Sequence, residues 1–280
     1  MRGWCLTEVD ERQRREARVL EMFSNAAAYE WLMGRWSARL APLFAGFARV
    51  GGDGRVLDVG CGTGALVQFL ADASDRSIIV GIDPSQPFID YARSRFTCPR
   101  FSFDVGDAME LPYPSHSFDQ SLSLLVFMHI PQPEKAASEM RRVTRPDGTV
   151  ATCTWAHPGL EMAAIFWEEA VRIDPHAKTR KPESRPCTRP GQLTEIWLAA
   201  GFEAVEETTL DLPTIFGSFD DYWIPFTSGA GPAGVYVETL STDHRQALRE
   251  GLRKRLRGHR EDGPISLKAT ALAVRGTVPS

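Results

Sequence analysis

Three features are scarce in this sequence: paired cysteines, long apolar runs and excess positive charge. Its five cysteines are scattered and form no C-x-x-C pair, which argues for reduced thiols and against a disulfide framework or a structural zinc site. No apolar run is long enough to cross a bilayer, and the first residues lack the apolar core of a secretion signal. We therefore expect a cytoplasmic protein that does not span a membrane.

The charge balance also limits the partners. Lys and Arg total 32 and Asp and Glu total 36, for a net charge of −4. Proteins that bind phosphate backbones broadly are usually basic, so we expect no nucleic-acid partner. No set of carboxylates clusters in the way that a magnesium site requires, and we expect no metal. The length of 280 residues and the apolar share of 43% suit one globular α/β unit with insertions.

The most informative stretch runs from Val56 to Gly64, where a short apolar strand opens into three alternating glycines and then into an amphipathic segment. Glycine adopts positive φ readily, and without a Cβ it lets another molecule approach the backbone closely. Three glycines within five residues therefore predict a ligand-binding turn at the carboxyl end of a strand. An ordinary strand-to-helix turn is the simpler alternative.

Acidic residues follow the next two predicted strands. Asp83 ends the apolar run that starts at Ile78, where it is placed to accept both hydroxyls of a ribose or to cap the helix that Pro84 opens. Asp107 follows the strand-like run 101–105 and is expected on the same rim, facing the exocyclic amine of adenine. Asp58, two residues before the first glycine, favours a ligand with a cationic group and would repel a pyrophosphate.

The glycine loop alone leaves other functions open. The segment from Gly60 to Ala65 also satisfies the relaxed dinucleotide pattern G-x-G-x-x-A, which fits an NAD-dependent oxidoreductase. Asp58 and Asp107 favour instead a nucleoside that carries an amine. A protein that binds such a cofactor without catalysis is the non-enzyme alternative.

Four segments together resemble the class I S-adenosylmethionine-dependent methyltransferases, in particular the small-molecule enzymes of ubiquinone and menaquinone biosynthesis. They are 56–64, 81–84, 106–114 and 117–130. The resemblance covers about residues 50–156, and the spacing of all four segments makes it far more specific than a lone glycine loop. It implies in-line transfer of a methyl group from S-adenosylmethionine to a small-molecule acceptor.

The resemblance also implies a set of cofactor-binding residues. The acid of the first strand and the glycine backbone would hold the methionine end, and the acid after the second strand would hold the ribose. Residues after the third strand would face adenine, and the end of the fourth would lie beneath the methylthio group. In chain order the set is Asp58, Gly60, Gly62, Gly64, Asp83, Pro84, Asp107, Ala108, Leu124 and Leu125.

Short apolar runs alternate with helical segments from Val56 to Trp155, which predicts parallel strands joined by right-handed crossovers. The expected fold class is α/β: a Rossmann-like, doubly wound, seven-stranded sheet that is mostly parallel, with the last strand antiparallel. Residues 1–50 would form a helical amino-terminal cap and 51–280 the methyltransferase domain. The last two strands are predicted at 202–210 and 265–274, with a lid-like insertion at about 212–263 between them.

Acceptor and base residues are predicted from less specific signals. Tyr29 and Trp36 of the cap, with Tyr222 and Trp223 of the insertion, would enclose an apolar or aromatic acceptor; alternatively, these aromatics pack as an internal core. His129 follows the fourth strand near the expected methyl group and is the candidate general base, with a turn histidine as the alternative. The sequence predicts neither the identity of the acceptor nor the oligomeric state.

Overall fold

The protein folds around one seven-stranded sheet. The computed structural model describes residues 30–280 except 52, 182–184, 230 and 259–261. The strands are β1 (Arg55–Val59), β2 (Ile78–Asp83), β3 (Phe101–Val105), β4 (Phe118–Leu124), β5 (Thr144–Leu160), β6 (Glu203–Phe216) and β7 (Ile265–Thr277). They lie in the order β3-β2-β1-β4-β5-β7-β6, and only β7 is antiparallel to its neighbours. The predicted fold class is confirmed.

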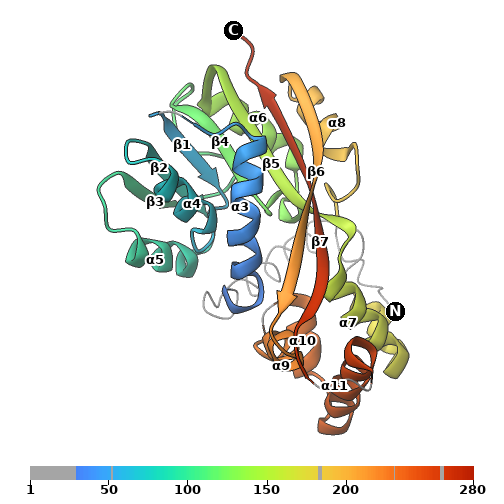
Figure 1. Cartoon of the computed structure of the whole chain (residues 1–280). Helices are drawn as coiled ribbons and strands as arrows, with labels where there is room; N and C mark the ends of the chain where they lie inside the picture. The colour runs from blue at the N-terminus through green and yellow to red at the C-terminus, as the bar shows by residue number, and fades with distance from the viewer. Residues whose placement is uncertain (1–29, 52, 182–184, 230, 259–261) are drawn as a thin grey trace, which may run out of the picture.

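Helices cover both faces of this sheet, and each face has its own apolar core (Figure 1). The first core includes residues of η1 (Glu30–Gly34), α3 (Arg35–Phe47), α4 (Ala65–Ala73) and α5 (Gln86–Arg95). The second includes residues of η2 (Phe127–His129), α6 (Pro133–Val143) and α8 (Gln192–Ala199). The alternation of strands and helices read from the sequence therefore gives the layered arrangement of a doubly wound fold.

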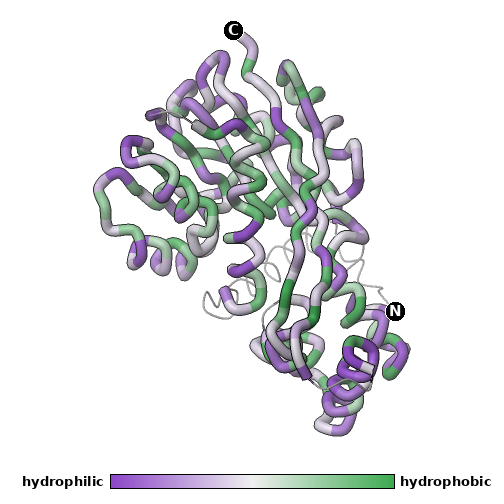
Figure 2. Tube along the Cα trace, viewed as in Figure 1, coloured by the Kyte–Doolittle hydropathy of each residue, from purple (hydrophilic) through white to green (hydrophobic). Residues whose placement is uncertain are grey.

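The remaining helices form a lobe at one end of the molecule, which we call the helical lobe. Its members are α7 (Glu161–Ile173), η3 (Pro175–Thr179), α9 (Phe219–Trp223), η4 (Ile224–Thr227), α10 (Gly231–Glu238) and α11 (Thr242–Arg257). Phe166 of α7 stacks on Phe226 of η4 with ring centroids 4.6 Å apart, so α7 shares a core with the insertion. The outer turns of α11 are mostly hydrophilic (Figure 2), while Leu248 and Leu252 are buried.

The helical lobe lies beyond the carboxyl ends of the parallel strands. Leu124, the last residue of β4, is level with Cys153 of β5, Ala273 of β7 and Thr208 of β6. From Thr208 the strand β6 continues to Phe216, which at about 3.3 Å per residue carries it roughly 26 Å past the tip of β4. Figure 1 shows the β6–β7 hairpin reaching in this way toward α9, α10 and α11.

The end of β6 corrects one prediction. The sequence places it at Leu210, whereas the strand extends to Phe216. Pro213 lies within the strand and pairs with Lys268 of β7. Proline has no N–H to donate, but β6 is the edge strand of the sheet and has no second neighbour that needs one.

Candidate functional site

Hydrogen bonds join the tips of neighbouring strands, β3 to β2 and β1 to β4, at one edge of the sheet. Gly106, after β3, donates its N–H to the carbonyl of Asp83 at the end of β2 (3.2 Å). Ser123 of β4 donates its hydroxyl to the carbonyl of Val59 at the end of β1 (2.9 Å). The segments that the sequence assigns to the cofactor therefore meet at the carboxyl edge, where doubly wound sheets bind their ligands.

The three glycines of the loop after β1 all have positive φ, but their surroundings differ. A Cβ on Gly60 would come within 2.4 Å of Val126, and one on Gly64 within 2.5 Å of Phe96, so both residues are required by packing. At Gly62 the nearest atom would be 3.9 Å away, on Phe88. Gly62 is therefore the point where the backbone is open to a ligand.

Asp83 joins this loop to the tip of β2. Its Oδ2 accepts from the N–H of Gly62 (3.0 Å) and its Oδ1 from that of Ser85 (2.9 Å). Burial raises its pKa to about 6, and the two backbone hydrogen bonds oppose that rise. Asp83 is thus a turn residue and not a helix cap, because α5 begins at Gln86 and its N-cap is Ser85, with no side-chain cap hydrogen bond. The role in ribose binding stays a prediction.

Asp58 is the most unusual group of the site. It is 1% exposed, and within the described part of the chain neither carboxylate oxygen has a hydrogen-bond partner. Burial, and then repulsion from Asp83, raise its pKa to about 8. An unpaired buried carboxylate is costly unless it takes up a proton or meets a cation. The ammonium group of an amino-acid ligand meets that need, whereas a pyrophosphate does not.

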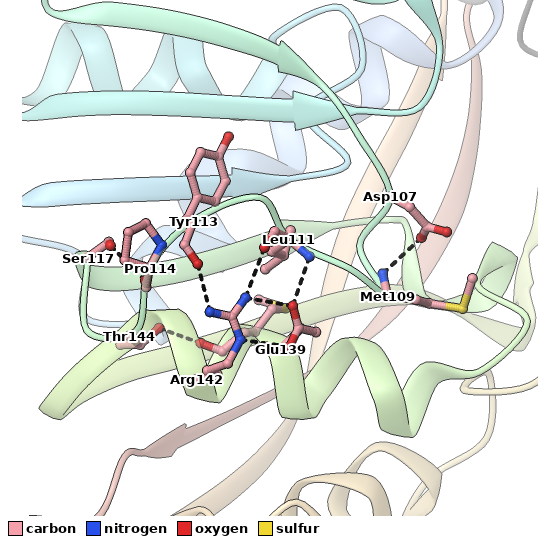
Figure 3. A network of polar contacts seen from close by, with 10 residues as sticks. Asp107, Met109, Leu111, Tyr113, Pro114, Ser117, Glu139, Arg142 and Thr144 are labelled. Atoms are coloured by element: carbon pink, nitrogen blue, oxygen red, sulfur yellow. Dashed lines mark hydrogen bonds and ion pairs between the residues drawn. The ribbon is translucent and has the colours of Figure 1, made fainter.

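Asp107 lies exposed at the start of the loop after β3. Its Oδ1 accepts from the backbone N–H of Met109 (2.8 Å; Figure 3). Glu139 and Arg142 of α6 hold this loop in place (Figure 3). Arg142 donates to the carbonyls of Tyr113 (2.7 Å) and Leu111 (2.9 Å), and Glu139 accepts from the N–H of Leu111 (2.8 Å).

The tip of β4 leads directly to His129. Leu124 and Leu125 are buried there, and Leu125 has a φ of 65°. His129, half-buried at the end of η2, has its Nδ1 2.6 Å from an Nη of Arg185. Burial and the guanidinium charge lower the pKa of His129 to about 3, so its imidazole is neutral at physiological pH and is a weak base.

Three of the four aromatic residues expected around the acceptor lie in a packed core. Tyr29 is outside the described residues. Trp36 and Tyr222 are fully buried and Trp223 is 5% exposed. The rings of Trp36 and Tyr222 contact Phe216 at centroid distances of 5.1 and 5.3 Å. The core alternative describes these contacts, and a role in acceptor binding stays a prediction.

Two contacts that the sequence does not indicate link the cap to both halves of the site. Glu30 of η1 accepts a hydrogen bond from the hydroxyl of Thr63 in the glycine loop. Arg35 of α3 forms an ion pair with Asp221 of α9 (2.7 Å). Both join residues far apart in the chain, so no local pattern could have revealed them.

None of the helices in the described ranges is both long and apolar enough to span a membrane. The same residues contain no group of three or more His, Cys, Asp or Glu that could hold a metal ion.

The fold and the site define a class: a Rossmann-like protein whose strand tips suit a nucleoside bearing a cationic amino acid. Comparison with known proteins agrees. The family model of the methyltransferase domain matches residues 57–152. The demethylmenaquinone methyltransferase of Roseiflexus castenholzii is 30% identical over 164 residues, which are 54% of this chain and 69% of that protein.

More distant relatives extend the likeness. The chloroplastic tocopherol O-methyltransferase of Arabidopsis thaliana is 32% identical over 131 residues, covering 45% of this chain and 37% of that protein. Among solved structures, phosphoethanolamine N-methyltransferase 2 of Haemonchus contortus, in complex with S-adenosylhomocysteine, has a TM-score of 0.58 at 19% identity. That match covers 95% of this chain and 59% of the other and shows a shared fold.

The chain belongs to the class I S-adenosylmethionine-dependent methyltransferases. It transfers a methyl group from S-adenosylmethionine to a small-molecule acceptor, so the NAD-dependent alternative falls away. The cofactor supplies a methyl group on a sulfonium, which leaves as a neutral thioether. The unpaired Asp58 carboxylate and the open backbone at Gly62 fit the charge and shape of its amino-acid end.

Proposed function

We propose that three carboxylates at the strand tips divide the recognition of S-adenosylmethionine. Asp58 receives the α-ammonium, Asp83 the ribose hydroxyls, and Asp107 with Ala108 the adenine. The backbone of Gly62 faces the methionine end. The observation that carries this proposal is the Asp58 carboxylate, which is buried and has no partner in the described part of the chain.

We infer further that the acceptor is a small ring-bearing molecule with a largely apolar surface, bound between the cap and the helical lobe. Three observations support this. The lobe lies beyond the strand edge that carries the cofactor residues. Its core is rich in aromatic side chains. Relatives of this chain are named for demethylmenaquinone and tocopherol, and we extend that acceptor class to this protein.

The protein's contribution to such a reaction is alignment and exclusion of water. Holding two reactants in a productive geometry is worth on the order of 7–11 kcal/mol. A base adds about 10²- to 10⁴-fold in rate and is needed only for an acceptor that is not yet nucleophilic. A cytoplasmic location is also part of the proposal, and the scattered cysteines support it.

Calorimetry and an acceptor screen test the proposed function. S-adenosylmethionine and S-adenosylhomocysteine should bind, NAD should not, and Asp83→Ala should weaken both binding reactions. Labelled methyl groups should then appear on members of a panel of hydroxylated aromatic compounds. Tight cofactor binding without transfer to any member of a broad panel would favour the non-catalytic alternative instead.

A point substitution tests the role of the helical lobe better than its deletion does. Deleting residues 214–262 would uncover Phe166 of α7, which stacks on Phe226, and would destabilise the remainder. Replacing Trp223 with Phe is more selective, because Trp223 is buried at 5% exposure and Phe keeps most of its apolar volume. A raised KM for the acceptor at unchanged cofactor affinity supports a role in acceptor binding, and an unchanged KM contradicts it.

A further inference from the structure

The described part of the cap, η1 and α3, contacts both parts of the proposed site. Helix α3 packs against α4, which follows the glycine loop, and also against β6, which carries the helical lobe. The turn η1 contacts η4 of the lobe, and a Cβ on Gly231 of α10 would lie 3.4 Å from Leu32 of η1. In Figure 1 the first turns of α3 are the part of this helix nearest the lobe. The cap therefore joins the cofactor side to the acceptor side.

Glu30 makes the contact on the cofactor side. Its carboxylate accepts a hydrogen bond from the hydroxyl of Thr63, which is buried. Thr63 directly follows Gly62, the residue whose backbone is open to a ligand. A ligand that orders Gly62 therefore also restricts Thr63 and, through its hydroxyl, the first residue of η1.

Arg35 makes the contact on the acceptor side, where β6 is followed by α9. Its guanidinium donates to a carboxylate oxygen of Asp221 (2.7 Å) and to the carbonyl of the same residue (3.2 Å). The guanidinium carbon also lies 4.4 Å from the ring centroid of Trp36 and 4.8 Å from that of Phe216, the last residue of β6. Asp221 in turn accepts from the N–H of Gly217 (2.9 Å). Arg35 thus fastens the first helix of the insertion to the cap.

Both contacts start from one continuous helical segment. Glu30 is the first residue of η1 and Arg35 the first of α3, and η1 leads directly into α3. Within residues 30–47 no loop separates them, so a restraint on one is carried to the other. The ion pair is also partly shielded from solvent, because its side chains are only 30% and 34% exposed.

We propose that Glu30 and Arg35 are positioning residues that couple the cofactor to the acceptor side of the enzyme. S-adenosylmethionine bound at the glycine loop restrains the cap through Glu30, and the cap restrains α9 through Arg35. The lobe then loses less entropy when it takes up the acceptor, so the acceptor binds more tightly once the cofactor is in place. By linkage, the acceptor strengthens cofactor binding by the same factor. This inference rests on the proposed function, because it concerns the two substrates of that methyl transfer.

Hydrogen exchange with and without S-adenosylhomocysteine tests the proposal, and it requires no knowledge of the acceptor. Two segments are compared: 60–66, in the glycine loop, and 217–227, in α9 and η4. Arg35→Gln removes the charge that pairs with Asp221. Arg39→Gln is the matched control, because Arg39 is exposed, lies one turn further along α3 and also contacts the ring of Trp36 (5.5 Å).

Saturating S-adenosylhomocysteine should slow exchange in 60–66 in all three proteins. In 217–227 it should slow exchange by about fivefold or more in the wild type and in Arg39→Gln, which is the lower end of the usual range for coupled sites. Arg35→Gln should lose most of this effect. No slowing in 217–227 of the wild type, or an equal effect of the two arginine substitutions, overturns the proposal. Failure of S-adenosylhomocysteine to bind the wild type would instead count against the proposed function.

Two further variants separate coupling from a merely structural role. Loss of a contact that only stabilises the lobe would speed exchange in 217–227 equally with and without ligand, so the ratio of the two rates would stay unchanged. Thr63→Val removes the hydroxyl that Glu30 accepts from, in the glycine loop and not in the lobe, yet it should reduce this ratio as Arg35→Gln does. Asp221→Asn, which removes the other charge of the ion pair, should do the same. A wild-type ratio in either variant would contradict the proposed connection.

Discussion

Replacing Asp58 with Asn should change stability and cofactor affinity in opposite directions. The folded protein holds a proton on this carboxyl up to a pKa of about 8, whereas the unfolded chain releases it near the ordinary value of 3.8. Between these two values the folded state binds more protons, so the wild type without cofactor loses stability as the pH rises from about 4 to about 8. Asparagine keeps the shape of the side chain and removes this titration.

The size of the stability change follows from the difference between the folded and unfolded pKa values of Asp58. About four pH units at roughly 1.4 kcal/mol each give on the order of 5 kcal/mol at full effect. Water that reaches the site reduces this value, so we expect a gain of several kcal/mol for Asp58→Asn at pH 8 and almost none at pH 4. Urea denaturation of the cofactor-free proteins at both pH values measures it.

Cofactor affinity should fall in the same variant. A hydrogen bond to a charged group is worth about 1.5–3 kcal/mol, which corresponds to a loss of about 10- to 150-fold in affinity for S-adenosylmethionine. Near pH 6.5 the wild type should also release a proton on binding, because the ammonium selects the ionised carboxylate. Calorimetry in two buffers of different ionisation enthalpy detects this proton, and the variant should release none.

A less stable variant at pH 8 with unchanged cofactor affinity would refute this account. The stability would then change in the opposite direction and the cofactor affinity would not depend on Asp58, so Asp58 would be a structural residue with a partner. Asp58→Glu is the matched control, because it retains the carboxyl group and should retain the dependence of stability on pH.

Three further predictions concern the scaffold of the site. Gly60→Ala should destabilise the protein by about 2 kcal/mol or more in urea denaturation, because a Cβ there would lie 2.4 Å from Val126 at a φ of 73°. Gly46→Ala in α3 is the control: among the described residues a Cβ there would meet nothing within 4 Å, so this variant should be neutral or more stable by up to about 1 kcal/mol. Arg142→Ala should weaken S-adenosylhomocysteine binding several-fold by freeing the loop on the adenine side, and calorimetry showing wild-type affinity would contradict this. Trp36→Ala should cost about 3–5 kcal/mol in thermal or urea unfolding because the side chain is fully buried; a cost below about 1 kcal/mol would mean that it is not part of the core.

The region that we assign to the cofactor could be predicted because its signals are local. The glycines, Asp58 and Asp83 each lie at the end of a short apolar run, and the crossover rule brings those ends to one edge. The end of β6 was misplaced because tolerance of Pro213 depends on β6 being an edge strand. Edge position is a property of the assembled sheet and leaves no mark in the local sequence.

The protonation states of His129 and Asp58 depend on tertiary contacts that the sequence does not show. The position of His129 after β4 could be predicted, but its low pKa comes from burial and, second, from Arg185, 56 residues away. In the same way, the sequence suggests a cationic partner for Asp58 but cannot show that the carboxylate is buried without one. The order of strands therefore predicts which residues lie near the site, but it does not predict their protonation states.

The strand lengths separate the region that matches the family model from the helical lobe, to which we assign the acceptor. The family model matches residues 57–152, which span β1 to the middle of β5 and contain every proposed cofactor-binding residue. The overhang of β6 and β7 begins beyond that region and carries the lobe past the tip of β4. The β5–β7 and β6–β7 ladders anchor this hairpin in the sheet independently of the helices of the lobe. If the lobe binds the acceptor as we propose, substitutions there should alter acceptor affinity while leaving the affinity for S-adenosylhomocysteine unchanged.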